Sequence, residues 1–136
     1  MTVKPPDPQE SVQQGALLGV LGIAGLAGGA GVALAAVAAH KVESPALATA
    51  ATMLMIHATA AVALLSVGTR LCHPQAWIRL AAVMLGAVTL FSGDIAVHTI
   101  MGVHVFPMAA PAGGSLLIAS WLGIVLLAAL EWRGGK

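Results

Sequence analysis

The sequence contains four long apolar runs from which charged side chains are almost entirely absent. Each run is roughly 18 to 25 residues long, and together they cover residues 15–39, 46–69, 80–102 and 113–130. A helix rises about 1.5 Å per residue, so about 20 apolar residues cross the hydrocarbon core of a bilayer. The runs therefore predict an all-α protein, a four-span transmembrane helical bundle with helices at 15–39, 46–69, 78–102 and 112–131.

Composition supports this prediction and leaves little room for a soluble domain. Apolar side chains make up 59% of the 136 residues, and charged side chains make up 8%. Soluble domains carry about 25% charged residues, and a small one leaves much of its surface in water. We expect a single transmembrane domain over residues 15–132. Residues 1–14 are polar and rich in proline, which predicts a disordered tail.

The distribution of Lys and Arg predicts the orientation. Four spans put both termini and the 70–79 connection on one side of the membrane. That side carries Lys4, Arg70, Arg79, Arg133 and Lys136, whereas the other side carries Lys41 alone. Positive residues favour the cytoplasmic side, so both termini are expected in the cytoplasm. Trp77 and Trp132 are expected at that membrane interface.

A cleaved leader is the alternative interpretation of the first run, because residues 36–39 read Ala-Val-Ala-Ala. The apolar run is longer than the core of a signal peptide, and the residues before it are uncharged or acidic. We therefore expect this segment to remain as a helix.

Glycines recur along the first run, and pairs four residues apart allow helices to approach closely in lipid. The pairs are Gly15 with Gly19 and Gly25 with Gly29. They predict tight packing within the chain or between copies. A pore or a hinge is the alternative.

Three ionisable residues fall inside the runs: His57, Asp94 and His98. A carboxylate in lipid is costly, so Asp94 must be partnered, face water or take up a proton. His98 follows one helical turn later and is its expected partner. A proton relay is one interpretation, and a hydrogen-bonded carboxylate near the outer leaflet is the other. His57 is expected to hydrogen-bond to a neighbouring helix.

Metal-ligating side chains collect on the predicted outer side, but without a tight motif. His40, Asp94, His98 and His104 are the candidates, and their nitrogen and oxygen donors would suit zinc, copper or nickel. The sequence contains no evident nucleophile paired with a base. We expect no enzyme, no cofactor and no nucleic-acid binding.

Four short motifs carry a resemblance to a known family. They are Ala38-Ala39-His40, Ile56-His57-Ala58, Leu90-Phe91-Ser92-Gly93 and Pro111-Ala112-Gly113-Gly114. In this order and spacing, over residues 15–130, the chain resembles domain of unknown function 423, a family that includes transmembrane protein 256. The resemblance implies four helices and a bacterial inner membrane, and it implies no activity. Many members have a serine where this chain has Asp94, which suggests a subgroup role for the carboxylate.

Three functions are consistent with the sequence. The first is a non-enzymatic bundle that acts as a homo-oligomer or as an accessory subunit of a membrane complex. The second is a proton-linked or small-solute transport element that uses His57, Asp94 and His98. The third is metal binding on the outer side.

Overall fold

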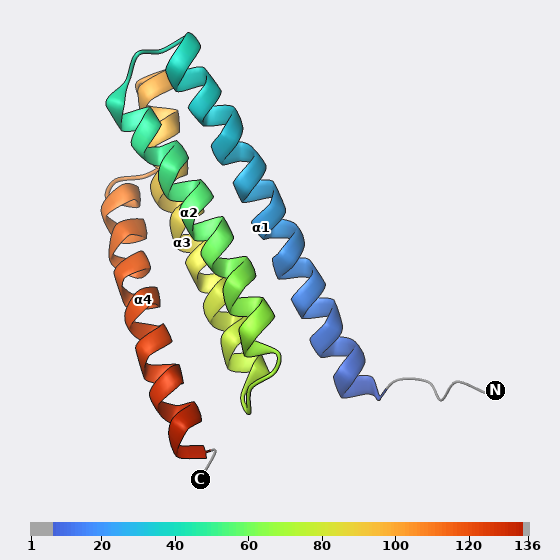
Figure 1. The fold of residues 1–136 in the computed structure, drawn as a ribbon. Helices are drawn as coiled ribbons and strands as arrows, with labels where there is room; N and C mark the ends of the chain where they lie inside the picture. The colour runs from blue at the N-terminus through green and yellow to red at the C-terminus, as the bar shows by residue number, and fades with distance from the viewer. Residues whose placement is uncertain (1–6, 135–136) are drawn as a thin grey trace, which may run out of the picture.

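The computed structural model describes residues 7–134, which form four helices (Figure 1). They are α1 (Pro8–His40), α2 (Pro45–Gly68), α3 (Pro74–Met101) and α4 (Ala109–Gly134). All four are long and apolar enough to cross a membrane. The predicted all-α, four-span bundle is confirmed.

Local sequence signals place the first three helix starts. A proline stands at the first position of each, at Pro8, Pro45 and Pro74. Proline suits this position because its missing N–H has no partner there in any helix. The Asp7 side chain accepts a hydrogen bond from Gln9 N at 2.9 Å, and the Ser44 side chain accepts one from Leu47 N at 3.3 Å. These two side chains satisfy backbone donors that the helices cannot.

The prediction that residues 1–14 form a disordered tail is wrong for the residues that the structure describes. Residues 8–14 are the first two turns of α1, and residues 1–6 lie outside the described part of the chain. The cap at Asp7, the proline that follows it and Glu10 in the first turn all favour a helix start here. Likewise, α3 begins four residues before the predicted position 78, at Pro74.

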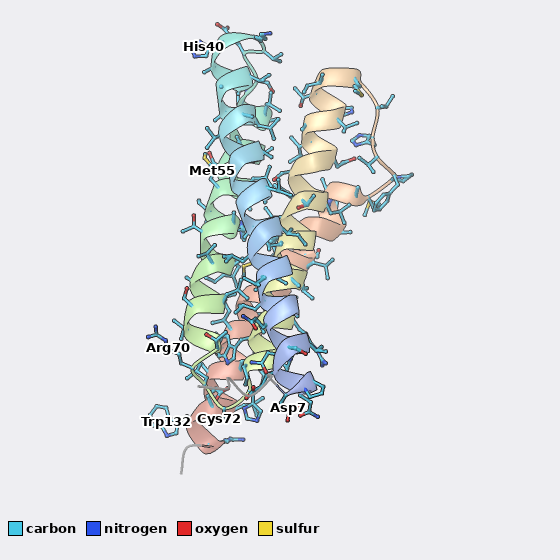
Figure 2. All side chains as sticks on the ribbon, turned by 90° about the vertical axis from the view of Figure 1, so that its right-hand side faces the viewer. Asp7, His40, Met55, Arg70, Cys72 and Trp132 are labelled. Atoms are coloured by element: carbon cyan, nitrogen blue, oxygen red, sulfur yellow. The ribbon has the colours of Figure 1, made fainter. Side chains whose placement is uncertain are left out.

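The helices alternate in direction and differ in how deeply they are buried. In the central parts of α2 and α3, 39% and 44% of the residues are buried, against 22% in α1 and 17% in α4. Figures 1 and 2 show α1 and α4 on opposite sides of the α2–α3 pair. One end of the bundle, here called the tail end, holds Asp7, the 69–73 connection and Gly134. The far end holds the connections at 41–44 and 102–108.

The glycines of α1 do not pack as predicted within the chain. A Cβ atom added at Gly15, Gly19, Gly25 or Gly29 would meet no atom within 4 Å. The close approach is instead at Gly31, where a Cβ atom would lie 3.1 Å from the Ala51 carbonyl oxygen. One face of α1 is buried against α2, and Gly31 lies on that face. The other four glycines lie at exposed positions.

The backbones of α3 and α4 approach closely at Gly113. A Cβ atom there would lie 2.6 Å from the Phe91 backbone nitrogen and 2.8 Å from the Ala87 carbonyl oxygen. At neighbouring Gly114, the nearest atom would be in the flexible Phe91 ring, at 3.6 Å. Of these two neighbouring glycines, Gly113 is therefore the one that packs directly against the α3 backbone.

This contrast predicts the effect of two neighbouring substitutions. Gly113→Ala should lower the free energy of unfolding by about 1–3 kcal/mol, because the methyl group forces two backbones apart. Gly114→Ala is the matched control and should leave stability unchanged or raise it by up to about 1 kcal/mol, because alanine favours a helix over glycine. Thermal unfolding of both variants in the same mild detergent measures the difference, and equal stabilities would contradict this account of the contact.

Candidate functional site

A carboxylate anchors the tail end of the bundle. Glu131 Oε1 of α4 accepts hydrogen bonds from His73 N at 3.0 Å and Trp77 Nε1 at 3.1 Å, and Oε2 accepts one from Cys72 N at 2.9 Å. His73 Nδ1 lies 3.2 Å from Oε1. The His73 side chain does not cap α3, so Glu131 supplies the acceptor that this helix start lacks, close to its positive dipole end.

Trp77, which was expected at the membrane interface, is buried inside the bundle: it is 4% exposed and donates to Glu131. Its depth in the membrane stays a prediction. Trp132 is exposed, as an interfacial indole would be. Glu131 was not among the predicted site residues, because an acidic residue at the end of the last apolar run resembles an ordinary boundary of the span.

His57 forms a hydrogen-bonded connection between α2 and α4. Its Nδ1 lies 2.8 Å from the Met53 carbonyl oxygen, and Trp121 Nε1 donates to its Nε2 at 3.2 Å. A neutral imidazole protonated at Nδ1 satisfies both contacts, because Nδ1–H donates and Nε2 accepts. The side chain is 4% exposed. Its expected hydrogen bond to a neighbouring helix exists, and the partner is an indole.

Asp94 anchors the far end. The residue is 2% exposed, Oδ2 lies 3.0 Å from His104 Nδ1, and Oδ1 accepts a hydrogen bond from Val105 N at 2.8 Å. The prediction that Asp94 is partnered is confirmed, but His98 is not the partner that hydrogen-bonds to it. The His98 ring stacks on the His104 ring, with centroids 4.0 Å apart and planes 8° from parallel. The 102–108 connection folds back along α3, so a loop residue reaches the carboxylate.

The two carboxylate clusters are spaced like the edges of a bilayer core. Asp94 follows His73 by 21 residues, about 31 Å of helix at 1.5 Å per residue. The hydrocarbon core is about 30 Å thick. Each cluster thus fits one boundary of the core, where polar atoms are least costly, while His57 lies between them with both nitrogens partnered.

The predicted metal ligands do not form a metal-binding group. Within residues 7–134, no group of three or more His, Cys, Asp or Glu side chains is placed to hold a metal ion. His40 ends α1 on the far end (Figure 2). Asp94 and His104 form a pair, and His98 only stacks on it. This geometry lets Asp94 hold the 102–108 connection in place through hydrogen bonds with His104 and Val105, which we call the Asp94 latch.

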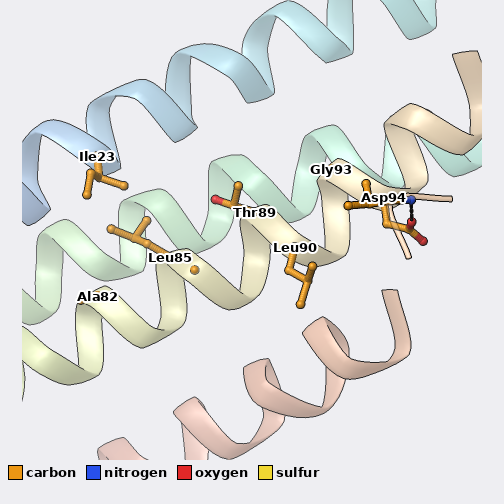
Figure 3. Close-up of a pocket in the computed structure, with 9 residues that line it drawn as sticks. Ile23, Ala82, Leu85, Thr89, Leu90, Gly93 and Asp94 are labelled. Atoms are coloured by element: carbon orange, nitrogen blue, oxygen red, sulfur yellow. Dashed lines mark hydrogen bonds between the residues drawn. The ribbon is translucent and has the colours of Figure 1, made fainter. Parts of the chain in front are cut away.

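An apolar groove separates α1 from α3 on one side of the bundle (Figure 3). Its volume is about 540 Å³, and Ile23, Gly86, Thr89 and Gly93 are among its lining residues. Asp94 and Val105 lie at one end, where their hydrogen bond closes the groove. The lining suits packing of apolar groups, and its small residues leave the α3 backbone accessible.

Comparison with known proteins gives one match. Residues 34–114 match the family described as Protein of unknown function (DUF423). The chain belongs to this family. No curated protein and no solved structure matches. The further likeness to transmembrane protein 256 stays a prediction.

The matched segment of this DUF423 member is shorter than the 15–130 range expected from the motifs. It contains His57, Asp94 and the 102–108 connection, and it includes all four motifs. It leaves out Trp121 and Glu131, which complete two of the polar contacts. The first part of α1, where the unpacked glycines lie, is also outside it.

The contact between His57 and Trp121 predicts a measurable coupling energy. In a double-mutant cycle of His57→Leu and Trp121→Phe, we expect a coupling of roughly 0.6 kcal/mol and at most about 1.7 kcal/mol, as for other hydrogen bonds between membrane helices. Denaturation in mixed detergent micelles measures it. Thr59→Val with Trp121→Phe is the control cycle and should be additive, because Thr59 bonds within its own helix. Additivity in both cycles would rule out the contact.

Proposed function

We propose that this DUF423 member is a non-enzymatic membrane bundle that assembles with further copies of itself through one face of α1. The observation that carries the proposal is the glycine face of this helix. At about 100° per residue, this face lies opposite the buried Val20, Ala24 and Ala27. Its exposed glycines are Gly15, Gly19, Gly22, Gly25 and Gly29, and no atom lies within 4 Å of a Cβ added at any of them.

The exposed side of α4 provides the contrast. Most of its exposed apolar side chains are large, with Ala119, Ala128 and Ala129 between them: Leu116, Ile118, Leu122, Val125, Leu126 and Leu130. Large aliphatic side chains suit contact with lipid tails, whereas small residues let a second helix approach closely. Each glycine also costs a helix about 1 kcal/mol relative to alanine. Leu18 and Leu26 are exposed on the same face of α1. The five glycines around them support an interface with protein, because they let a second helix approach between these two side chains.

A second copy of the chain is the occupant that fits this face best. Between Gly15 and Gly29 the helix carries no charged or strongly polar side chain, so nothing repels an identical face. A two-fold axis parallel to the helix would pair the face with itself, as in most homo-oligomers. A larger complex with a different subunit is the alternative outcome.

The transport hypothesis has less support. His57 bonds to Met53 and Trp121, and Asp94 bonds to the 102–108 connection. No hydrogen bond joins these two groups in the part of the chain that the structure describes. Proton transfer between them would need a path that this arrangement does not provide.

We further propose that the bundle lies in a bacterial inner (plasma) membrane with its tail end in the cytoplasm. Arg70 and Arg133 lie at the tail end, Arg79 lies in the second turn of α3, and Lys41 lies at the far end. This distribution supports the orientation through the preference of positive residues for the cytoplasmic side.

The assembly proposal predicts that bulk on the glycine face breaks the oligomer and leaves the fold intact. Gly22→Leu and Gly29→Leu should shift the particle from the oligomer to the mass of one chain, with little change in thermal unfolding. Ala129→Leu, which adds bulk to an exposed position of α4, is the control and should keep the oligomer. Mass measurement in mild detergent or native nanodiscs tests this. A wild-type protein with the mass of one chain would refute self-assembly, and a co-purifying different subunit would favour the alternative.

The orientation predicts opposite signals from two reporter fusions. A reporter that is active only in the cytoplasm should be active when it is fused after residue 136. A reporter that is active only after export across the membrane should be active when it is inserted within 102–108. Signals from the same side at both positions would contradict the single span, α4, that separates them.

A further inference from the structure

The 102–108 connection exposes an unusual amount of apolar surface for a loop. Val103, Phe106 and Met108 are 56%, 45% and 71% exposed, and Met101 just before the loop is 71% exposed. Exposure of such side chains to water costs about 25 cal/mol for each Å² of apolar surface. Figure 2 shows this connection standing out from the bundle at one side. The loop is therefore poorly suited to water.

The hydrogen bonds of Asp94 fix the depth of this loop. Asp94 lies seven residues before the last residue of α3, about 10 Å along the helix at 1.5 Å per residue. Because its carboxylate holds His104 and Val105 N, the loop folds back to that level. The chain reverses at Gly102, with φ of 73°, and at Met108, with φ of 71°. A positive φ is costly for a residue such as methionine and persists where the surrounding structure holds it.

The other connection at the far end has the opposite character. It contains Lys41, Glu43 and Ser44, with two charged side chains in four residues. Both connections are at the same end of the bundle, so they face the same leaflet. The 41–44 turn suits water, and the 102–108 loop does not.

We propose that the 102–108 loop is a lipid-binding element that lies in the far leaflet, at the boundary between hydrocarbon and headgroups. Val103, Phe106 and Met108 insert among the lipids, and Asp94 is the buried latch that keeps them there. Backbone N–H groups placed at this depth need an acceptor within the protein. The Asp94 carboxylate supplies one to Val105 and holds the adjacent His104 side chain. This inference does not depend on the assembly through α1.

Spin labels test the location of the loop directly. In a Cys72→Ser background, Phe106→Cys and the control Glu43→Cys are labelled with a nitroxide in detergent. The proteins are then reconstituted into phosphatidylethanolamine–phosphatidylglycerol vesicles. The label at 106 should collide mainly with O₂ and lose accessibility to a water-soluble nickel chelate, whereas the label at 43 should show the reverse. Equal nickel accessibility at both sites would overturn the proposal, and so would protection of site 106 from both reagents, which would indicate a protein partner.

A second variant tests the latch. Asp94→Ala in the protein labelled at 106 should raise nickel accessibility and label mobility there, because the loop loses its acceptor. The same substitution in the protein labelled at 43 should change nothing, which shows that the bundle remains folded. If the 106 label stays in the lipid with unchanged mobility while the 43 label is unaffected, the latch role of Asp94 is refuted.

Discussion

The bundle depends on side chains that give backbone donors near its two ends an acceptor within the protein. Lipid offers none, and an unsatisfied N–H group there costs several kcal/mol. Side chains cap α1 and α2 locally, at Asp7 and Ser44. The start of α3 and the loop after it have no such cap, and carboxylates distant in sequence replace it. Glu131 reaches α3 from α4, and Asp94 reaches the loop from within α3.

This requirement explains which features could be predicted from the sequence. The apolar runs, the prolines at helix starts and the charge-rich 41–44 turn are local signals, and the helices follow them closely. The partners of the polar residues are not local. Trp121 is 64 residues from His57, and Glu131 is 54 residues from Trp77, so no spacing rule connects them. For Asp94, the local rule favoured His98, but the loop that folds back supplied His104 instead.

Glycine shows the same limit in a different form. The sequence presents Gly25, Gly29 and Gly31 in one apolar run, with nothing to separate a packed glycine from an unpacked one. Only the rotation of α1 about its axis decides, and α2 fixes that rotation by packing over Gly31. Once the rotation is known, Gly15, Gly19, Gly22, Gly25 and Gly29 lie on one exposed face, whereas Gly28 is half-buried next to Ala58. The pattern therefore predicted the kind of surface, while the fold determined where the surface points.

The same arrangement limits how this protein can be recognised within the membrane. His57 has both ring nitrogens partnered, and each oxygen of Asp94 and of Glu131 accepts at least one hydrogen bond inside the chain. Polar recognition at membrane depth is then weak, and shape must distinguish one neighbour from another. The chain offers three kinds of surface: a glycine-rich face on α1 that also carries Leu18 and Leu26, a face of mostly large aliphatic side chains on α4, and an apolar loop at the far end. Under the proposals above, a second helix would pack on the first and lipid would contact the other two. The exposed Thr59 and Ser66 hydroxyls bond within their own helix, so this difference in side-chain size would provide the specificity.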